Sequence, residues 1–137
     1  MSNSTASTAG VVRIASAHSV PQTAARLEAL LQERGVLIFA RIDFSADAAR
    51  AGLELRPEQL LIFGNPRAGT PLMQAEAVAG LDLPLKALIY EDGAGTAWIA
   101  WNDPAYIVGR HALPAALAAN LAAVTPLIER AAQPNAG

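Results

Sequence analysis

The stretch from Gly64 to Pro71 (Gly-Asn-Pro-Arg-Ala-Gly-Thr-Pro) has the spacing most typical of a binding loop. It follows an apolar segment and precedes a segment of helical composition, and free N–H groups at the start of a helix bind anions. Arg67 would add a positive charge there. Thr70 stands where a phosphate loop requires lysine, so the pattern disfavours a nucleotide site. It favours a structural turn with Thr70 as helix cap, or a pocket for an anion or small ligand.

Lys86 is the only lysine of the chain and lies within an apolar run from Leu83 to Tyr90. A lysine in such a run needs a carboxylate partner or a route to water. We therefore expect an ion pair, either within the chain or across a dimer interface. The alternative is an enzyme that uses Lys86, Glu91 and His111 as acid–base groups, which requires the three side chains to converge in one pocket.

The two histidines, His18 and His111, are isolated in the sequence and lack the spacing of a metal-binding pair. Either one is a candidate ligand for a metal ion or for a non-covalently bound haem, with Met73 as a second axial ligand. The sequence identifies no cofactor beyond this haem alternative. Because the chain has no cysteine, disulfides, thiolate metal sites and cysteine nucleophiles are excluded.

Composition and charge restrict the partners. The chain has 137 residues, which is the length of one domain, and a formal net charge of −2. This charge argues against non-specific binding to nucleic acid or to anionic membranes. No apolar run reaches the roughly 18 residues of a membrane span, and residues 1–10 do not resemble a secretory signal. We therefore expect a cytoplasmic protein without membrane or nucleic-acid partners.

The surface has few charges to cover it. Apolar residues make up 53% of the chain and charged residues only 16%, whereas about 25% charged residues is typical. Apolar patches left exposed by such a composition usually mark an interface. We therefore expect a homo-oligomer, and a two-fold dimer is the most frequent kind.

Hydrophobic periodicity predicts the elements that position these residues. Strands are expected at 11–17, 36–44 and 59–63, with helices after Ser19, at 46–51 and at 70–79. The clearest element is a hairpin of two strands, 83–91 and 96–102, around a turn at 92–95. A helix is expected from Pro104 towards Arg110, followed by a last helix that Pro126 kinks.

The order β-α-β-α-β-α-β-β-α-α predicts an α+β fold. We expect a two-layer sandwich with a mainly antiparallel sheet and helices on one face, which leaves the other face open. Strand alternation places Trp98 and Trp101 on opposite faces, so one tryptophan would point to the open face. In the strand 36–44, alternation places Phe39, Arg41 and Asp43 on one face. Residues 11–130 would form the single domain, between flexible tails at 1–10 and 131–137.

Several ordered motifs resemble the family called domain of unknown function 302. They are Ala-Arg-Leu at 25–27, Phe-Ala-Arg-Ile-Asp at 39–43, Leu-Leu-Ile-Phe-Gly-Asn-Pro at 60–66, Gly-Thr-Pro-Leu-Met at 69–73, Leu-Asp-Leu-Pro-Leu-Lys at 81–86, Glu-Asp at 91–92 and Asn-Asp-Pro at 102–104. The resemblance covers about residues 11–130. It implies a compact two-layer domain, similar to one lobe of the TATA-binding protein, that tends to form homodimers, and it brings neither DNA binding nor an agreed activity. The motif residues that would line a shared site are Asn65, Thr70, Met73, Lys86, Glu91, Asn102 and His111.

These observations together favour a homodimeric binding protein. It would hold a small or hydrophobic ligand at the open sheet face, near the loop at 64–71. The residues expected to bind that ligand are Asn65, Arg67, Thr70, Met73, Lys86 and Asn102. A haem or metal protein through His111 or His18, and an enzyme that uses Lys86, Glu91 and His111, are the alternative hypotheses.

Overall fold

A computed structural model describes residues 8–135; residues 1–7 and 136–137, which belong to the expected tails, lie outside the described residues. The elements follow one another in the predicted order. They are β1 (Val11–Ala15), α1 (Val20–Glu33), β2 (Leu37–Asp43), α2 (Phe44–Arg50), β3 (Glu58–Gly64), α3 (Pro66–Ala75), the 3-10 helix η1 (Ala77–Asp82), β4 (Leu85–Glu91), β5 (Ala97–Asn102), α4 (Pro104–Arg110), the 3-10 helix η2 (Ala115–Leu117), α5 (Ala118–Ala122) and α6 (Thr125–Ala132).

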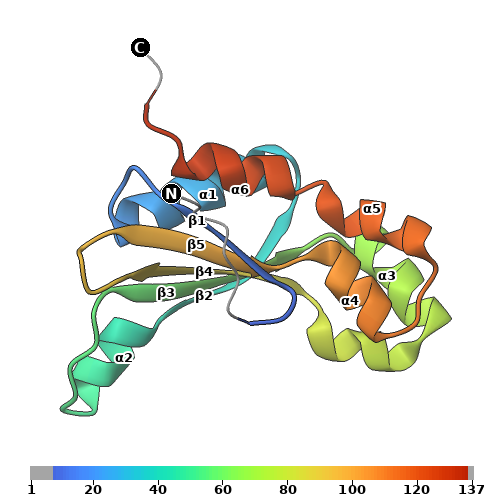
Figure 1. The fold of residues 1–137 in the computed structure, drawn as a ribbon, viewed down its shortest axis with the longest axis horizontal. Helices are drawn as coiled ribbons and strands as arrows, with labels where there is room; N and C mark the ends of the chain where they lie inside the picture. The colour runs from blue at the N-terminus through green and yellow to red at the C-terminus, as the bar shows by residue number, and fades with distance from the viewer. Residues whose placement is uncertain (1–7, 136–137) are drawn as a thin grey trace.

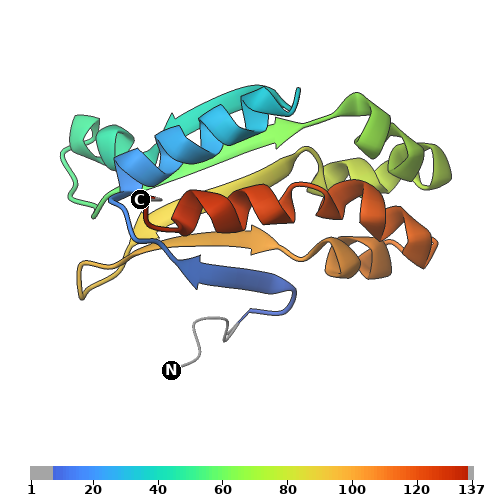
Figure 2. The same ribbon diagram turned by 90° about the horizontal axis from the view of Figure 1, so that it is seen from above.

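The five strands form one sheet in the order β1-β5-β4-β3-β2, and every neighbouring pair is antiparallel. Helices α1 and α6 lie side by side over one face of the sheet (Figures 1 and 2). Helices α3, α4 and α5 gather beyond one end of the sheet, and α2 lies at the opposite end (Figure 1). The predicted α+β fold, with an antiparallel sheet and a helix layer, is confirmed.

The core lies between the sheet and the helices α1 and α6. Ser19 begins α1 with a capping box that it shares with Gln22, and Val20, Leu27 and Leu31 form its buried stripe. These side chains meet inward-pointing residues of the central strands, among them Leu61, Phe63, Ile89 and Ile99. Burying a leucine or isoleucine side chain contributes about 1.5–3 kcal/mol, so this apolar contact holds the two layers together.

Both tryptophans are buried, with 7% of Trp98 and 8% of Trp101 exposed. Trp101 belongs to the core under the helices. Trp98 lies on the opposite face, where the Arg13 guanidinium covers its ring at 4.1 Å from the centroid and its Nε1 donates to Asp92 Oδ2 at 2.8 Å. Trp98 is therefore not an exposed aromatic of the open face, because its own chain covers it.

The middle of that face carries partly exposed aliphatic side chains, with Lys86 and Tyr90 of β4 beside them, and we call this face the bare face. Strand register places Ile42 opposite Leu60, Leu60 opposite Leu88, and Leu88 opposite Ala100, so these residues form one row across four strands. Ala40 and Ile62 form a second pair beside it. No helix within residues 8–135 crosses the middle of this face (Figure 1). None of the helices in that range is both long enough and apolar enough to cross a membrane.

Helix α3 begins earlier than expected. Asn65, rather than Thr70, is its N-cap, and its Oδ1 accepts a hydrogen bond from the Arg67 N–H at 2.9 Å. Pro66 then occupies the first helical position, where the missing N–H removes no hydrogen bond. The expectation that Thr70 caps a helix at 70–79 is wrong, because the Asn-Pro pair already starts the helix, which ends at Ala75, and η1 begins at Ala77.

Candidate ligand pocket at one end of the sheet

A pocket of about 510 Å³ lies where β2 begins, β3 ends and β4 begins, and we call it the sheet-end pocket. Antiparallel pairing brings these strand ends together at one end of the sheet. Helix α3 and the junction between α5 and α6 close the remaining sides. Pockets for small ligands usually have volumes of roughly 300–1,000 Å³. The volume therefore suits one small molecule.

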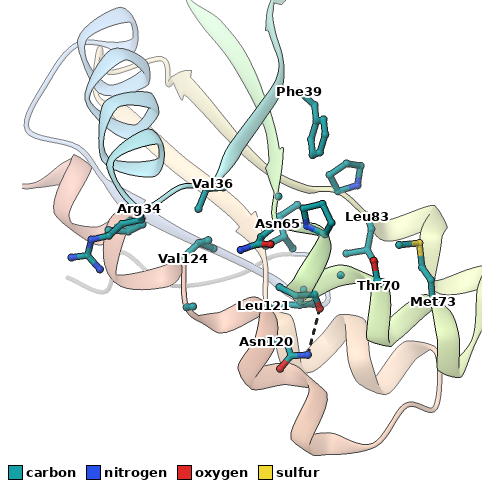
Figure 3. A pocket seen from close by; sticks show the side chains of 18 residues that line it. Arg34, Val36, Phe39, Asn65, Thr70, Met73, Leu83, Asn120, Leu121 and Val124 are labelled. Atoms are coloured by element: carbon teal, nitrogen blue, oxygen red, sulfur yellow. Dashed lines mark hydrogen bonds between the residues drawn. The ribbon is translucent and has the colours of Figure 1, made fainter.

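The lining is mostly apolar. Figure 3 shows Val36, Leu121 and Val124 on one side of the pocket and Phe39, Leu83 and Met73 on the other. Polar side chains come from Asn65, Thr70 and Asn120, and among the described residues the only charged side chain of the lining is that of Arg34. The remaining lining residues are Gly64, Pro66, Ala68, Gly69, Pro84, Leu85, Ala123 and Leu127.

Two of the polar side chains hold the walls of the pocket. The Asn65 side chain caps α3 through its Oδ1, so its amide NH₂ remains available. Asn120 Nδ2 donates to the Ala68 carbonyl oxygen at 3.4 Å, which ties α5 to α3 at one side of the pocket (Figure 3). Residues of this one chain therefore form the described walls of the pocket.

The residues expected to bind a ligand are divided by the structure. Asn65, Thr70 and Met73 line the sheet-end pocket, whereas Arg67, on the same helix, does not. Lys86 and Asn102 line a narrow cavity of about 10 Å³ beside Trp101, which has room for at most about one water molecule. The six residues therefore do not all line one cavity.

Lys86 Nζ donates to the Pro84 carbonyl oxygen at 3.2 Å. Within the described residues it forms no ion pair with a carboxylate of its own chain. Glu91 lies five residues further along β4, which places it about 17 Å away and on the other face of the sheet. The structure therefore does not bring Lys86 and Glu91 together.

His111 joins a different cluster, at the end of α4. Its Nε2 donates to Asp82 Oδ2 at 2.5 Å, and Arg110 Nη1 donates to both oxygens of the same carboxylate at 3.1 Å. The side chains of His111 and Asp82 are only 7% and 19% exposed. The hydrogen bond from His111 lowers the pKa of Asp82, and the charge of Arg110 adds to this effect against the opposing effect of burial. This cluster ties η1 to α4, and none of its three residues lines the sheet-end pocket.

His18 lies near the end of α6, with its Nε2 at 2.7 Å from the Gln133 carbonyl oxygen. Neither histidine lines the sheet-end pocket, although Met73 does. Within residues 8–135, no three acidic or histidine side chains form a group that could hold a metal ion. The histidines therefore contribute nothing to the sheet-end pocket.

Sequence reasoning missed three residues that shape the pocket: Arg34, Phe39 and Asn120. Gly35, which ends α1, marks Arg34 as a residue at a helix end, and Asn120 is the one strongly polar residue between Leu113 and Val124. These were the available signals. They could not show that the three residues face one cavity, because that depends on how α1, β2 and α5 meet.

This chain matches part of the length of its curated relatives. The chain is 48% identical over 104 residues to a protein of Brucella suis biovar 1 (strain 1330) named fluoride-specific ion channel FluC 1, and the match covers 76% of this chain and 41% of that protein. A protein of the same name from Brucella abortus biovar 1 (strain 9-941) is also 48% identical over 104 residues, with 38% of its length covered. The chain therefore spans about two fifths of the length of these relatives.

A solved structure and a family model agree on the kind of domain. The crystal structure of an uncharacterized conserved protein DUF302 from Bacillus stearothermophilus superimposes with a TM-score of 0.75 at 21% identity, over 91% of this chain and 97% of that one. At this identity the likeness shows the fold. The model of the family described as domain of unknown function DUF302 matches residues 12–131, so the resemblance expected from the motifs is confirmed and the chain belongs to the DUF302 family.

Proposed function

We propose that this protein is a binding protein that holds one small apolar ligand in the sheet-end pocket. The observation that carries the proposal is a pocket of about 510 Å³ with a largely apolar lining and a few polar side chains, which is the usual make-up of a small-molecule site. The expected loop at 64–71 contributes to the pocket. The sequence predicted a ligand on the open sheet face, whereas in this proposal the ligand lies at the end of the sheet.

The lining favours binding over acid–base catalysis. Arg34 is the only lining side chain that carries a charge, and the lining contains no carboxylate, histidine or lysine. General acid–base chemistry at neutral pH relies mainly on those groups. The residues of the enzyme hypothesis, Lys86, Glu91 and His111, all lie outside the lining.

A matched pair of variants tests the proposal. Ala123 lines the pocket, while its neighbour Ala122, which is also exposed, does not. The neutral probe N-phenyl-1-naphthylamine should gain fluorescence with the wild-type protein and with Ala122→Trp. Ala123→Trp should weaken this binding at least about ten-fold, because the indole would occupy the cavity. Equal binding to both variants, with unchanged circular dichroism, would mean that the probe binds elsewhere.

We also propose that two copies associate through the bare face. The row of aliphatic side chains from Ile42 to Ala100 is only partly buried in one chain. Covering such a contiguous apolar patch is favourable, and two-fold dimers are the most frequent assemblies. Because the sheet-end pocket lies at one end of the sheet and not on the bare face, it would stay accessible in such a dimer.

A second candidate function is a role beside a fluoride-specific ion channel. It is favoured by the 48% identity between this chain and about two fifths of the Brucella suis protein of that name. We propose that the matched region is an accessory domain of that channel and that this chain has the same task. Fluoride efflux from vesicles would be measured for the Brucella suis protein with its 104-residue matched region deleted, and with residues 12–131 of this chain in its place. Deletion should change the rate and replacement should restore it; an unchanged rate after deletion would reject this role.

A further inference from the structure

The distribution of charge around the sheet-end pocket indicates a narrower class of ligand. We propose that the pocket binds a free amphipathic carboxylate, with its hydrocarbon chain inside the pocket and its carboxylate at Arg34. This inference rests on the proposed binding function. It adds a charged head group, which an apolar pocket alone does not require.

Arg34 lies at one end of the pocket. Figure 3 shows it beyond Val36 and Val124, with its guanidinium pointing away from the other labelled side chains. An arginine in this position uses its carbon stem as part of the wall and keeps its charge in water. Within the described residues the guanidinium forms no hydrogen bond or ion pair, so its donors are available to a ligand. A guanidinium binds a carboxylate with two parallel hydrogen bonds.

The far end of the pocket is mostly apolar, with Thr70 as its polar residue (Figure 3). Phe39, Leu83 and Met73 lie on the side opposite Arg34 (Figure 3). Phe39 and Met73 are 53% and 41% exposed, so a hydrocarbon chain there would remove apolar surface of the protein from water. A molecule that is polar at one end and apolar at the other matches this arrangement.

The pocket also discriminates against cations. None of its 18 lining residues carries a carboxylate, so an ammonium head group would meet only Arg34, which has the same sign of charge. The amide NH₂ of Asn65 is a further donor on the lining and suits an acceptor group. Both features favour an anionic head group over a cationic one.

Competition with the probe N-phenyl-1-naphthylamine tests the expected preference for an anionic head group. Three ligands that share a ten-carbon chain are compared: decanoate, 1-decanol and decyltrimethylammonium. Decanoate should displace the probe from the wild-type protein at roughly five-fold lower concentration than 1-decanol, the size expected for a solvent-exposed ion pair. Decyltrimethylammonium should be the weakest. The advantage of decanoate should shrink in 1 M salt, because salt screens exposed charges.

Variants assign the effect to one residue. Arg34→Gln should make decanoate and 1-decanol equal, and Arg34→Lys should keep part of the preference. Arg67→Gln is the matched control, since Arg67 is an exposed arginine near the pocket that does not line it; it should leave the preference unchanged.

The outcomes separate this inference from the proposed function. Equal displacement by decanoate and 1-decanol, or a preference that survives Arg34→Gln, would overturn the proposal that Arg34 binds a carboxylate. The proposal that the pocket binds a small apolar ligand would stand. Probe binding that Ala123→Trp does not weaken would overturn both. Retention of the protein on phosphatidylglycerol vesicles, without displacement of the probe by decanoate, would assign the anionic head group to a membrane lipid and overturn a free ligand.

Discussion

Asp82 connects η1 to the end of α4 through one carboxylate. His111 and Arg110 both donate to it, and 19% of its side chain is exposed. Removing the charge would leave the largely buried His111 facing a weaker acceptor. At the scale of single residues, this cluster is the clearest polar contribution to stability.

We expect Asp82→Asn to lower the free energy of unfolding at pH 7 by about 1–3 kcal/mol. The pKa of Asp82 lies below its ordinary value of 3.8 in the folded protein, so its stabilisation is present above that pH and is lost as the pH falls through the lowered pKa. The variant should therefore lose less stability than the wild type between pH 7 and pH 3. Urea unfolding at both pH values measures the difference.

Asp47→Asn is the control for this experiment. Asp47 pairs with Arg50 on the surface, where its side chain is 53% exposed, and exposed pairs contribute little. It should keep the wild-type stability and acid sensitivity. An Asp82→Asn variant that behaves in the same way would show that the cluster does not stabilise the fold.

At the scale of elements, two glycines have opposite effects on the stability of the fold. Gly95 has φ +85° in the turn between β4 and β5, a region that costs other residues about 1–2 kcal/mol. Gly109 lies inside α4 with open space around its Cα, where glycine is roughly 0.5–1 kcal/mol worse than alanine. Gly95→Ala should therefore lower the melting temperature, and Gly109→Ala should raise it. Because the chemical change is identical, each variant controls for the other, and shifts of the same sign would contradict the account.

Local signals predicted most of the elements. The hairpin of β4 and β5 follows from apolar strands on both sides of Asp92-Gly93-Ala94-Gly95, and Pro126 separates α5 from α6 as its chemistry requires. A β-bulge between Ile38 and Ala40 was not predictable. Across the bulge Ile38 pairs with Phe63 and Arg41 pairs with Leu61, so Ile38 and Arg41 lie on the same face of the sheet. Strict alternation would put these two residues on different faces, so it assigns the faces of β2 wrongly.

The candidate site was less predictable than the fold. The loop at 64–71 was visible in the sequence because Gly, Asn and Pro mark it. Arg34, Phe39 and Asn120 were not, since three distant segments bring them to the same pocket. Sequence spacing also could not show that Lys86 and His111 lie apart from that pocket, because long-range packing decides it.

At the scale of the whole molecule, the bare face determines the proposed assembly. Leu88 lies at its centre, between Leu60 and Ala100. Leu88→Glu would place like charges near each other in a two-fold dimer, so we expect a monomer with an unchanged fold. Light scattering coupled to size-exclusion chromatography gives the mass. Leu81→Glu, at a residue that is 75% exposed on η1, should leave the dimer intact. A monomeric wild type, or a dimer that survives Leu88→Glu, would rule out this interface.

The edge strand β1 pairs with β5, which joins Val11 to Asn102, about 90 residues further along the chain. The other strands pair with their neighbours in sequence, across connections of at most about 20 residues. A longer loop costs more conformational entropy to close, and distant pairings slow folding. We therefore expect β2 to β5 to assemble first and β1 to join last. Pulsed hydrogen exchange during refolding should show the amides of Val11–Ala15 protected after those of β4, and simultaneous protection would contradict this order.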